Sequence, residues 1–135
     1  MGEFAECLDG IKEACEFLNY PVVSGNVSFY NGTNKKNIFP TPVIGGVGLI
    51  KKLSKPMNHY FKSEKSSILL IGKTFGHLEQ SCFLKENFSI IEGTPPEINL
   101  INEKNNGEII LKLINNGLIK SVHDVSSGGL LVALS

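Results

Sequence analysis

The sequence predicts an α+β fold in which mixed β-sheets are covered by helices. Residues 3–18 and 100–116 carry apolar side chains at the spacing of amphipathic helices. Short apolar and β-branched runs, which lack this helical period, indicate strands. These runs are residues 20–23, 43–50, 67–72 and 118–123.

The composition is that of a folded protein without a strong electrostatic field. Of 135 residues, 41% are hydrophobic and 19% are charged, and the formal net charge is zero. Charge therefore gives no reason to expect nucleic acid or an anionic membrane as a partner. All 13 basic residues are lysines, so a bound phosphate has to be held by backbone N–H groups, lysines, hydroxyls or a metal ion.

Cysteine usage and the absence of long apolar runs indicate a cytoplasmic protein. Cys7, Cys15 and Cys82 lack a metal-binding spacing and are expected to be reduced thiols. No run approaches the ~20 apolar residues that span a bilayer. Glu3 and Glu6 are unlike the basic start of a secretory signal.

The first half predicts one helix followed by extended chain. The helix at 3–18 presents an apolar stripe of Phe4, Leu8, Ile11, Cys15 and Leu18. A strand at 20–23 follows, and then a polar turn at 31–37 that starts with Asn-Gly. Two prolines keep the chain extended before the strand at 43–50. The glycines of that strand suit the close approach of another backbone or a ligand.

A Lys- and Ser-rich stretch at 51–66 separates two predicted domains, residues 1–60 and 61–135. The third predicted strand leads through a turn to a helix start at 77–86. The helix at 100–116 ends at an Asn-Gly pair, and its apolar face is formed by Ile109, Ile110, Leu113 and Ile114. A further apolar helix begins near the last residue, so we expect more sequence to follow.

Gly25, Asn26 and Ser28 form the first candidate site. The glycine lets a backbone approach a ligand closely. The amide oxygen of Asn26 is a hard ligand suited to Mg²⁺, and the Ser28 hydroxyl can donate to a substrate. In a strand, Asn26 and Ser28 lie on the same face. The alternative is a Gly-Asn turn in which both side chains only cap the backbone, and spacing alone favours that turn.

Asp124, Gly128 and Gly129 form the second candidate site, where a strand gives way to a helix. The two serines between them are good N-cap residues. The glycines leave the N–H groups of the helix start open to a phosphate, and Asp124 is placed to hold a metal beside it. The alternative is a structural helix start with a packing glycine, next to a surface histidine, His123. The spacing of the residues favours neither the phosphate site nor the structural helix start.

Two further features give weaker evidence of a functional site. Residues 72–74, Gly-Lys-Thr, end like a phosphate-binding loop, but the glycine that such a loop needs five residues earlier is Ser67. This motif is therefore excluded. His59 lies in the polar stretch and is expected to be solvated.

Taken together, the motifs resemble phosphoribosylformylglycinamidine synthase. Residues 20–31 (Tyr-Pro-Val-Val-Ser-Gly-Asn-Val-Ser-Phe-Tyr-Asn) and 40–45 (Pro-Thr-Pro-Val-Ile-Gly) resemble the second N-type nucleotide-binding domain of this family. Residues 118–130 resemble the start of its final, C-type domain. Their His-Asp-x-Ser-x-Gly-Gly pattern is shared with aminoimidazole ribonucleotide synthetase and its relatives. The resemblance is collinear over nearly the whole chain. It implies a partial aminoimidazole ribonucleotide synthetase-like fold.

The resemblance also implies a function. The family is an ATP-dependent, Mg²⁺-using ligase that converts formylglycinamide ribonucleotide to the amidine, with ammonia supplied by a glutaminase domain or subunit. It implies that Gly25 contacts ATP, Asn26 binds Mg²⁺ and Ser28 contacts the substrate. Asp124, Gly128 and Gly129 are implied to lie near nucleotide or phosphate.

The chain also departs from the family. The family's catalytic histidines, ATP-binding lysine and acidic Mg²⁺ ligands have no match, and residues 76–81 stand where the family often has a Gly-Gly-Ser-Glu run. We therefore expect no synthase activity without the remaining half of the synthase. An exposed sheet edge is expected to cause self-association.

Two alternatives to the ligase remain open. One is a non-catalytic nucleotide-binding or dimerisation module, favoured by the lack of a general base and by the glycine-rich strand at 43–50. The other is a fragment that exposes core surface and binds nothing.

Overall fold

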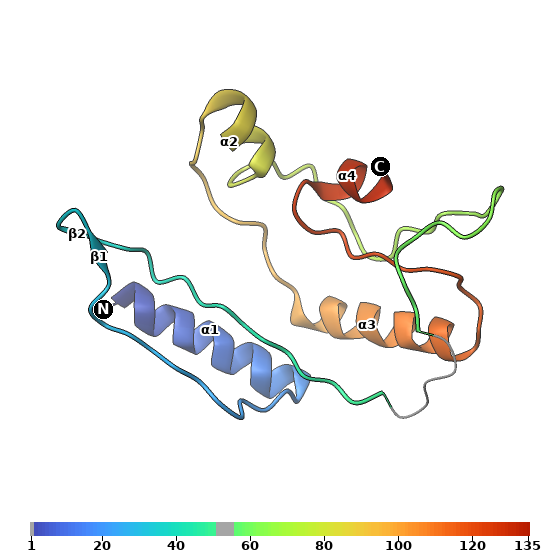
Figure 1. Ribbon diagram of the computed structural model, residues 1–135, viewed down its shortest axis with the longest axis horizontal. Helices are drawn as coiled ribbons and strands as arrows, with labels where there is room; N and C mark the ends of the chain where they lie inside the picture. Colours follow the sequence, from blue (N-terminus) through green and yellow to red (C-terminus); the bar gives the residue numbers. More distant parts are fainter. Residues whose placement is uncertain (1, 51–55) are drawn as a thin grey trace. The chain divides into compact units, whose positions relative to one another are not determined.

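The structure, a computed structural model, describes residues 2–50 and 56–135. The element order is α1, β1, β2, α2, α3, α4 (Figure 1). The chain separates into two units, Met1–Lys51 and Lys52–Ser135, which are described in turn. Residues 51–55 of the boundary expected at 51–66 lie outside the described residues.

The first unit begins with α1, Gly2–Leu18, which confirms the helix expected at 3–18. The helix ends where Asn19 adopts a φ of 53°, the left-handed conformation that commonly closes a helix. The N–H groups of Asn19 and Tyr20 then donate to the carbonyls of Glu16 and Cys15 at 3.3 and 2.9 Å. The chain's own sequence is thus sufficient to stop this helix.

The half-buried face of α1 differs from the stripe expected from the sequence. It consists of Phe4, Cys7, Ile11, Ala14 and Cys15. Leu8 and Leu18 of the expected stripe are 49% and 41% exposed. The shift follows from what the helix contacts. The ring of Phe4 packs edge-on against Phe29 with centroids 5.4 Å apart, and the Cys7 thiol donates to the Pro40 carbonyl at 3.5 Å. The chain on either side of the hairpin runs along α1 (Figure 1).

A small hairpin forms the tip of the first unit. Its strands are β1, Gly32–Thr33, and β2, Lys36–Asn37, which pair antiparallel. The two residues between them, Asn34 and Lys35, have φ values of 52° and 62°, as a type I′ turn requires. The polar turn expected at 31–37 is therefore confirmed, although its centre lies after the Asn-Gly pair rather than on it.

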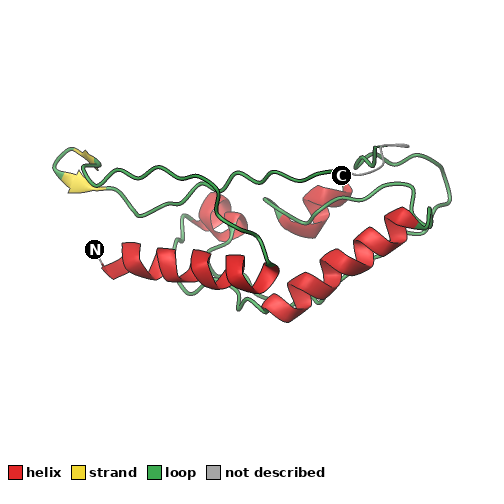
Figure 2. Cartoon of the chain, turned by 90° about the horizontal axis from the view of Figure 1, so that it is seen from below, coloured by secondary structure: helices red, strands yellow, loops and turns green. Residues whose placement is uncertain are grey.

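The four strands expected from apolar runs are not formed among the described residues, whose only sheet is β1–β2. Residues 20–23, 43–50, 67–72 and 118–123 run as loops (Figure 2). A strand is stable only when a neighbour accepts and donates its backbone hydrogen bonds, and the described chain offers these runs no such neighbour. Helices and strands both occur, but the expected mixed sheets are here reduced to one hairpin.

The second unit contains the remaining helices. α2, Cys82–Phe88, starts after Ser81, whose hydroxyl accepts from the Leu84 N–H at 3.2 Å. The helix start expected at 77–86 thus begins later, because the serine cap fixes it. α4, Gly129–Leu134, confirms the helix start expected near the last residues.

α3, Leu100–Asn115, confirms the helix expected at 100–116. The Asn99 side chain caps it by accepting from the Asn102 N–H at 3.0 Å, and Gly117 ends it with a φ of 66°. Its half-buried face consists of Leu100, Asn106, Ile110, Leu113 and Ile114, whereas the expected Ile109 is 44% exposed.

No residue in the described part of the chain is fully buried. Among the same residues, no helix is both long enough and apolar enough to cross a membrane.

Candidate functional site

The first candidate site lies in the loop between α1 and β1. Its members Gly25, Asn26 and Ser28 are all exposed. Residues 21–27 make no hydrogen bond within the described chain. Val22 and Val23 in this loop expose 68% and 89% of their surface. The backbone around Gly25 and Asn26 is therefore fully accessible to a ligand or to another strand.

The chain's own conformation does not require a glycine at position 25. A Cβ added to Gly25 would meet nothing within 4 Å, and its φ is not positive. The side chain of Asn26 likewise has no hydrogen bond within the described chain. Both residues are thus free to meet a group that the chain itself does not supply.

Ser28 is engaged locally. Its hydroxyl donates to Asn31 Oδ1 at 3.4 Å, and Asn31 Nδ2 donates back to the Ser28 carbonyl at 3.1 Å. The side chains of Asn26 and Ser28 therefore do not cap the backbone, as the alternative Gly-Asn turn would require. The hydroxyl can still reach a substrate, because both residues are exposed and the bond to Asn31 is long.

The second candidate site surrounds the start of α4. Gly128 and Gly129 have φ values of 87° and 74°, and a Cβ on Gly128 would lie 2.6 Å from Val132 Cγ2. Gly128 is itself the N-cap, with no side-chain hydrogen bond. The expectation that Ser126 or Ser127 caps this helix is therefore wrong, because the left-handed glycine turns the chain after them. Folding alone explains the glycine at 128.

Asp124 extends from this loop into solvent. Its carboxylate is 86% exposed and lies 3.4 Å from His123 Nδ1, in an ion pair that forms only when the histidine is protonated. The ring of His123, by contrast, is only 39% exposed. The carboxylate is thus available to a ligand, while the ring of His123 is partly shielded.

His59 holds His123 from the other side. The two rings meet edge-on, with centroids 5.3 Å apart and planes at 67°, and Tyr60 lies 4.2 Å from His59 on a tilted plane. His59 is exposed, as expected for a residue of the polar stretch. Its ring contact with His123 was not expected, because the two residues lie in segments far apart along the chain.

A third polar cluster joins two turns around α2, and we refer to it as the Glu79–Thr94 clasp. Glu79 Oε2 accepts from the Thr94 N–H at 2.7 Å and from its hydroxyl at 3.2 Å. His77 Nε2 lies 2.8 Å from the Thr94 carbonyl, and Gln80 Nε2 donates to the Gly93 carbonyl at 3.0 Å. The clasp therefore consists of residues 77, 79, 80, 93 and 94.

The hydrogen bonds of the Glu79–Thr94 clasp favour the charged form of Glu79. The Thr94 N–H lowers the pKa of Glu79 most, followed by the Thr94 hydroxyl. Burial opposes them, and the charge of His77, the smallest effect, lowers the pKa again. Gly93 has a φ of 95°, and a Cβ there would lie 2.6 Å from Glu79 Cβ and Cδ. The turn at residues 76–81 thus bonds to its own chain.

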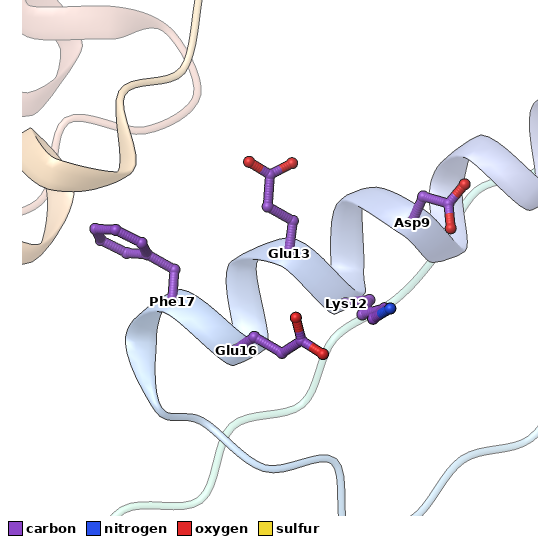
Figure 3. A pocket seen from close by; sticks show the side chains of 5 residues that line it. All are labelled: Asp9, Lys12, Glu13, Glu16 and Phe17. Atoms are coloured by element: carbon purple, nitrogen blue, oxygen red, sulfur yellow. The ribbon is translucent and has the colours of Figure 1, made fainter.

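The remaining surface holds no predicted site residue. Figure 3 shows a shallow hollow along α1 lined by Asp9, Lys12, Glu13, Glu16 and Phe17. Among the described residues, no group of three histidine, cysteine or acidic side chains is placed to hold a metal ion.

Comparison with known proteins supports the resemblance seen in the motifs. Residues 1–50 match the family model of the AIR synthase related protein, N-terminal domain. All 135 residues are 58% identical to the phosphoribosylformylglycinamidine synthase subunit PurL of Pelagibacter ubique. They are 52% identical to that of Nitrobacter winogradskyi and 51% identical to that of Bradyrhizobium diazoefficiens. The chain spans 18% of the length of each of these relatives. No solved structure matches it.

Proposed function

We propose that this chain, which resembles phosphoribosylformylglycinamidine synthase subunits along its whole length, is part of an ATP-dependent ligase. The reaction converts formylglycinamide ribonucleotide to formylglycinamidine ribonucleotide in purine biosynthesis, in the cytoplasm. The observation that carries the proposal is the identity of 58% over all 135 residues with a subunit of that name. An identity of this size over a whole chain is stronger support for a shared local structure than a short motif is.

Each residue of the first candidate site has a role in this proposal. Gly25 lets its backbone approach ATP, since the space beside it is open. The Asn26 amide oxygen is a ligand for the Mg²⁺ that accompanies ATP. Ser28 donates its hydroxyl to the nucleotide substrate. When bound, ATP would supply the phosphoryl group that makes the amide oxygen of the substrate a leaving group, so that ADP is released first and inorganic phosphate leaves as ammonia forms the new C–N bond.

The second candidate site has a weaker role. Asp124 offers an exposed carboxylate, and the turn at Gly128 and Gly129 offers backbone N–H groups to nucleotide or phosphate. Because folding already requires the glycine at 128, the carboxylate is the better test of this site.

The chain supplies one wall of the active site rather than all of it. Mg²⁺ prefers six oxygen ligands, and Asn26 is one of them, with no cluster of acidic residues beside it in the described chain. We therefore assign the acid–base groups and the other metal ligands to the remaining half of the synthase. Ammonia comes from a glutaminase domain or subunit. The 135 residues alone are then inactive.

The loops at 20–28 and 43–50 become strands in the proposed assembly. Val43, Val47 and Leu49 expose 93%, 88% and 88% of their surface, and burial of such side chains favours folding by about 25 cal/mol per Å². Pairing with the remaining half would produce the mixed sheets of an aminoimidazole ribonucleotide synthetase-like fold. The proposed division is an N-type domain ending near residue 60 and a C-type domain from residue 61.

An Asn26→Ala substitution in the complete synthase tests the proposal. We expect the Mg²⁺ concentration needed for half-maximal amidine formation to rise about tenfold or more, because one oxygen ligand is lost. Asn105→Ala, on the exposed side of α3, is the matched control and leaves Mg²⁺ dependence unchanged. Equal Mg²⁺ dependence in wild type and Asn26→Ala would contradict the assignment.

The alternative function is a non-catalytic nucleotide-binding or dimerisation module, which the exposed apolar loop at 43–50 favours. Calorimetry of the 135-residue chain with ADP and Mg²⁺ separates the two. Binding without any contribution to catalysis in the complete protein favours the module. Ultracentrifugation tests the self-association that the exposed loop predicts, and a monomer at all concentrations would exclude it.

A further inference from the structure

We propose that His59 is a positioning residue, which fixes the ring of His123 and thereby the loop that presents Asp124 to nucleotide. The proposal rests on the proposed function, because it concerns the second candidate site of the same ligase. Nothing in the motif at 123–129 points to residue 59. The assignment comes from the packing of two distant segments against each other.

The backbone brings these segments together. The Val122 N–H donates to the Asn58 carbonyl at 3.0 Å. Further along, Lys120 Nζ donates to Ser63 Oγ at 2.8 Å. Two bonds, one on each side of His59, hold the polar stretch beside the run that leads into the motif. His59 therefore has a fixed place relative to His123.

The ring contact completes the arrangement. An aromatic edge carries partial positive charge and a face carries partial negative charge, so rings 5.3 Å apart at 67° attract each other. Tyr60 packs on His59 at 4.2 Å and restricts its rotation. The Asp124 carboxylate lies 3.4 Å from His123 Nδ1, in the ion pair that forms when the histidine is protonated, and it is 86% exposed. The Asp124 carboxylate therefore has the His123 ring as its support and remains open to a ligand.

The contacts explain which property of His59 matters. Only its ring is used, because neither ring nitrogen of His59 makes a hydrogen bond in the described chain. A phenyl ring at position 59 keeps an aromatic edge and face, whereas leucine keeps apolar bulk without them. The two replacements therefore separate ring contact from mere space filling.

The test uses the complete synthase, with ATP as the varied substrate. For His59→Leu we expect the KM for ATP to rise about three- to tenfold with kcat little changed, from the strength of an aromatic pair. For His59→Phe we expect recovery to within about twofold of wild type. Phe61→Ala is the control, because Phe61 is exposed in the same segment and has no ring contact with His123.

Three outcomes would overturn the proposal: an unchanged KM in His59→Leu, no recovery in His59→Phe, or an equal rise in Phe61→Ala. Thermal unfolding of each variant is measured alongside, and a lowered transition with an unchanged KM also counts against it. Failure of the proposed function is recognised separately, because the wild-type protein would then form no amidine from ATP and ammonia.

Discussion

In the Glu79–Thr94 clasp the chain bonds to itself, whereas residues 21–27 bond to nothing within the described chain. Glu79, His77 and Gln80 satisfy the backbone of residues 93 and 94 with bonds of 2.7 to 3.0 Å. The loop at 21–27 has neither backbone nor side-chain hydrogen bonds there. Its valines and its glycine are all exposed.

The difference shows where the information for each region resides. The clasp joins residues 77–80 to residues 93 and 94, and these residues supply all of its hydrogen-bond partners. Residues 21–27 carry valines suited to a buried strand and backbone groups that need partners. A region of this kind is completed by a neighbouring strand or a ligand, which is where the proposed function places ATP. The glycines of the two regions differ in the same way: Gly93 serves the fold, and Gly25 does not.

Gly25→Ala in the complete synthase should give the largest effect. Because the Cβ meets nothing within 4 Å, we expect the free energy of unfolding to change by less than about 0.5 kcal/mol. The kcat/KM for ATP should fall about 10- to 100-fold, because a methyl group displaces the nucleotide from its place. Kinetics with ATP varied, beside thermal unfolding, measure both.

The control for this variant is Gly10→Ala, since a Cβ on Gly10 in α1 also meets nothing within 4 Å. Full activity in Gly25→Ala would remove the contrast between the two regions.

Gly93→Ala should have the opposite effects to Gly25→Ala, because it should lower stability and leave the KM for ATP nearly unchanged. An alanine at a φ of 95° and 2.6 Å from Glu79 costs about 1–2 kcal/mol in backbone conformation, and the contact adds to it. We expect faster amide hydrogen exchange across residues 89–96 by mass spectrometry, with the KM for ATP within about twofold of wild type. A large loss of ATP affinity without faster exchange would show that the clasp belongs to the binding site.

Local signals explain what the sequence predicted well. The helices at 3–18 and 100–116 follow from apolar spacing, and Gly117 marks an end because it tolerates a positive φ. The start of α2 was expected at residue 77 and lies at residue 82, after the N-cap Ser81. Short-range chemistry thus predicts the existence of a helix better than the residue at which it begins.

The features that could not be predicted from the sequence depend on contacts between distant residues. The strands at 20–23 and 43–50 need partners that the described chain does not provide. The His59–His123 contact and the clasp join residues with no periodic relation, so spacing could not reveal them. For the first candidate site, the sequence suggested the residues and the structure adds that they are exposed, whereas the proposed function assigns the rest of the site to groups outside this chain.

The smallest effect is a pH dependence confined to the clasp. The lowered pKa of Glu79 means that the folded clasp binds its proton less tightly than the unfolded chain, whose ordinary value is 4.5. The contribution to stability is therefore fully present above pH 4.5 and is lost as the pH falls through the lower pKa of the folded state. His77 and Glu92 are the other titratable groups of these turns. The Thr94 amide proton, followed by NMR, should shift with pH only below 4.5, and Glu79→Gln should abolish that shift.

Because residues 21–27 contain no titratable side chain, their amides serve as the internal reference. An equal acid shift in both regions would show that the titration is not that of the clasp.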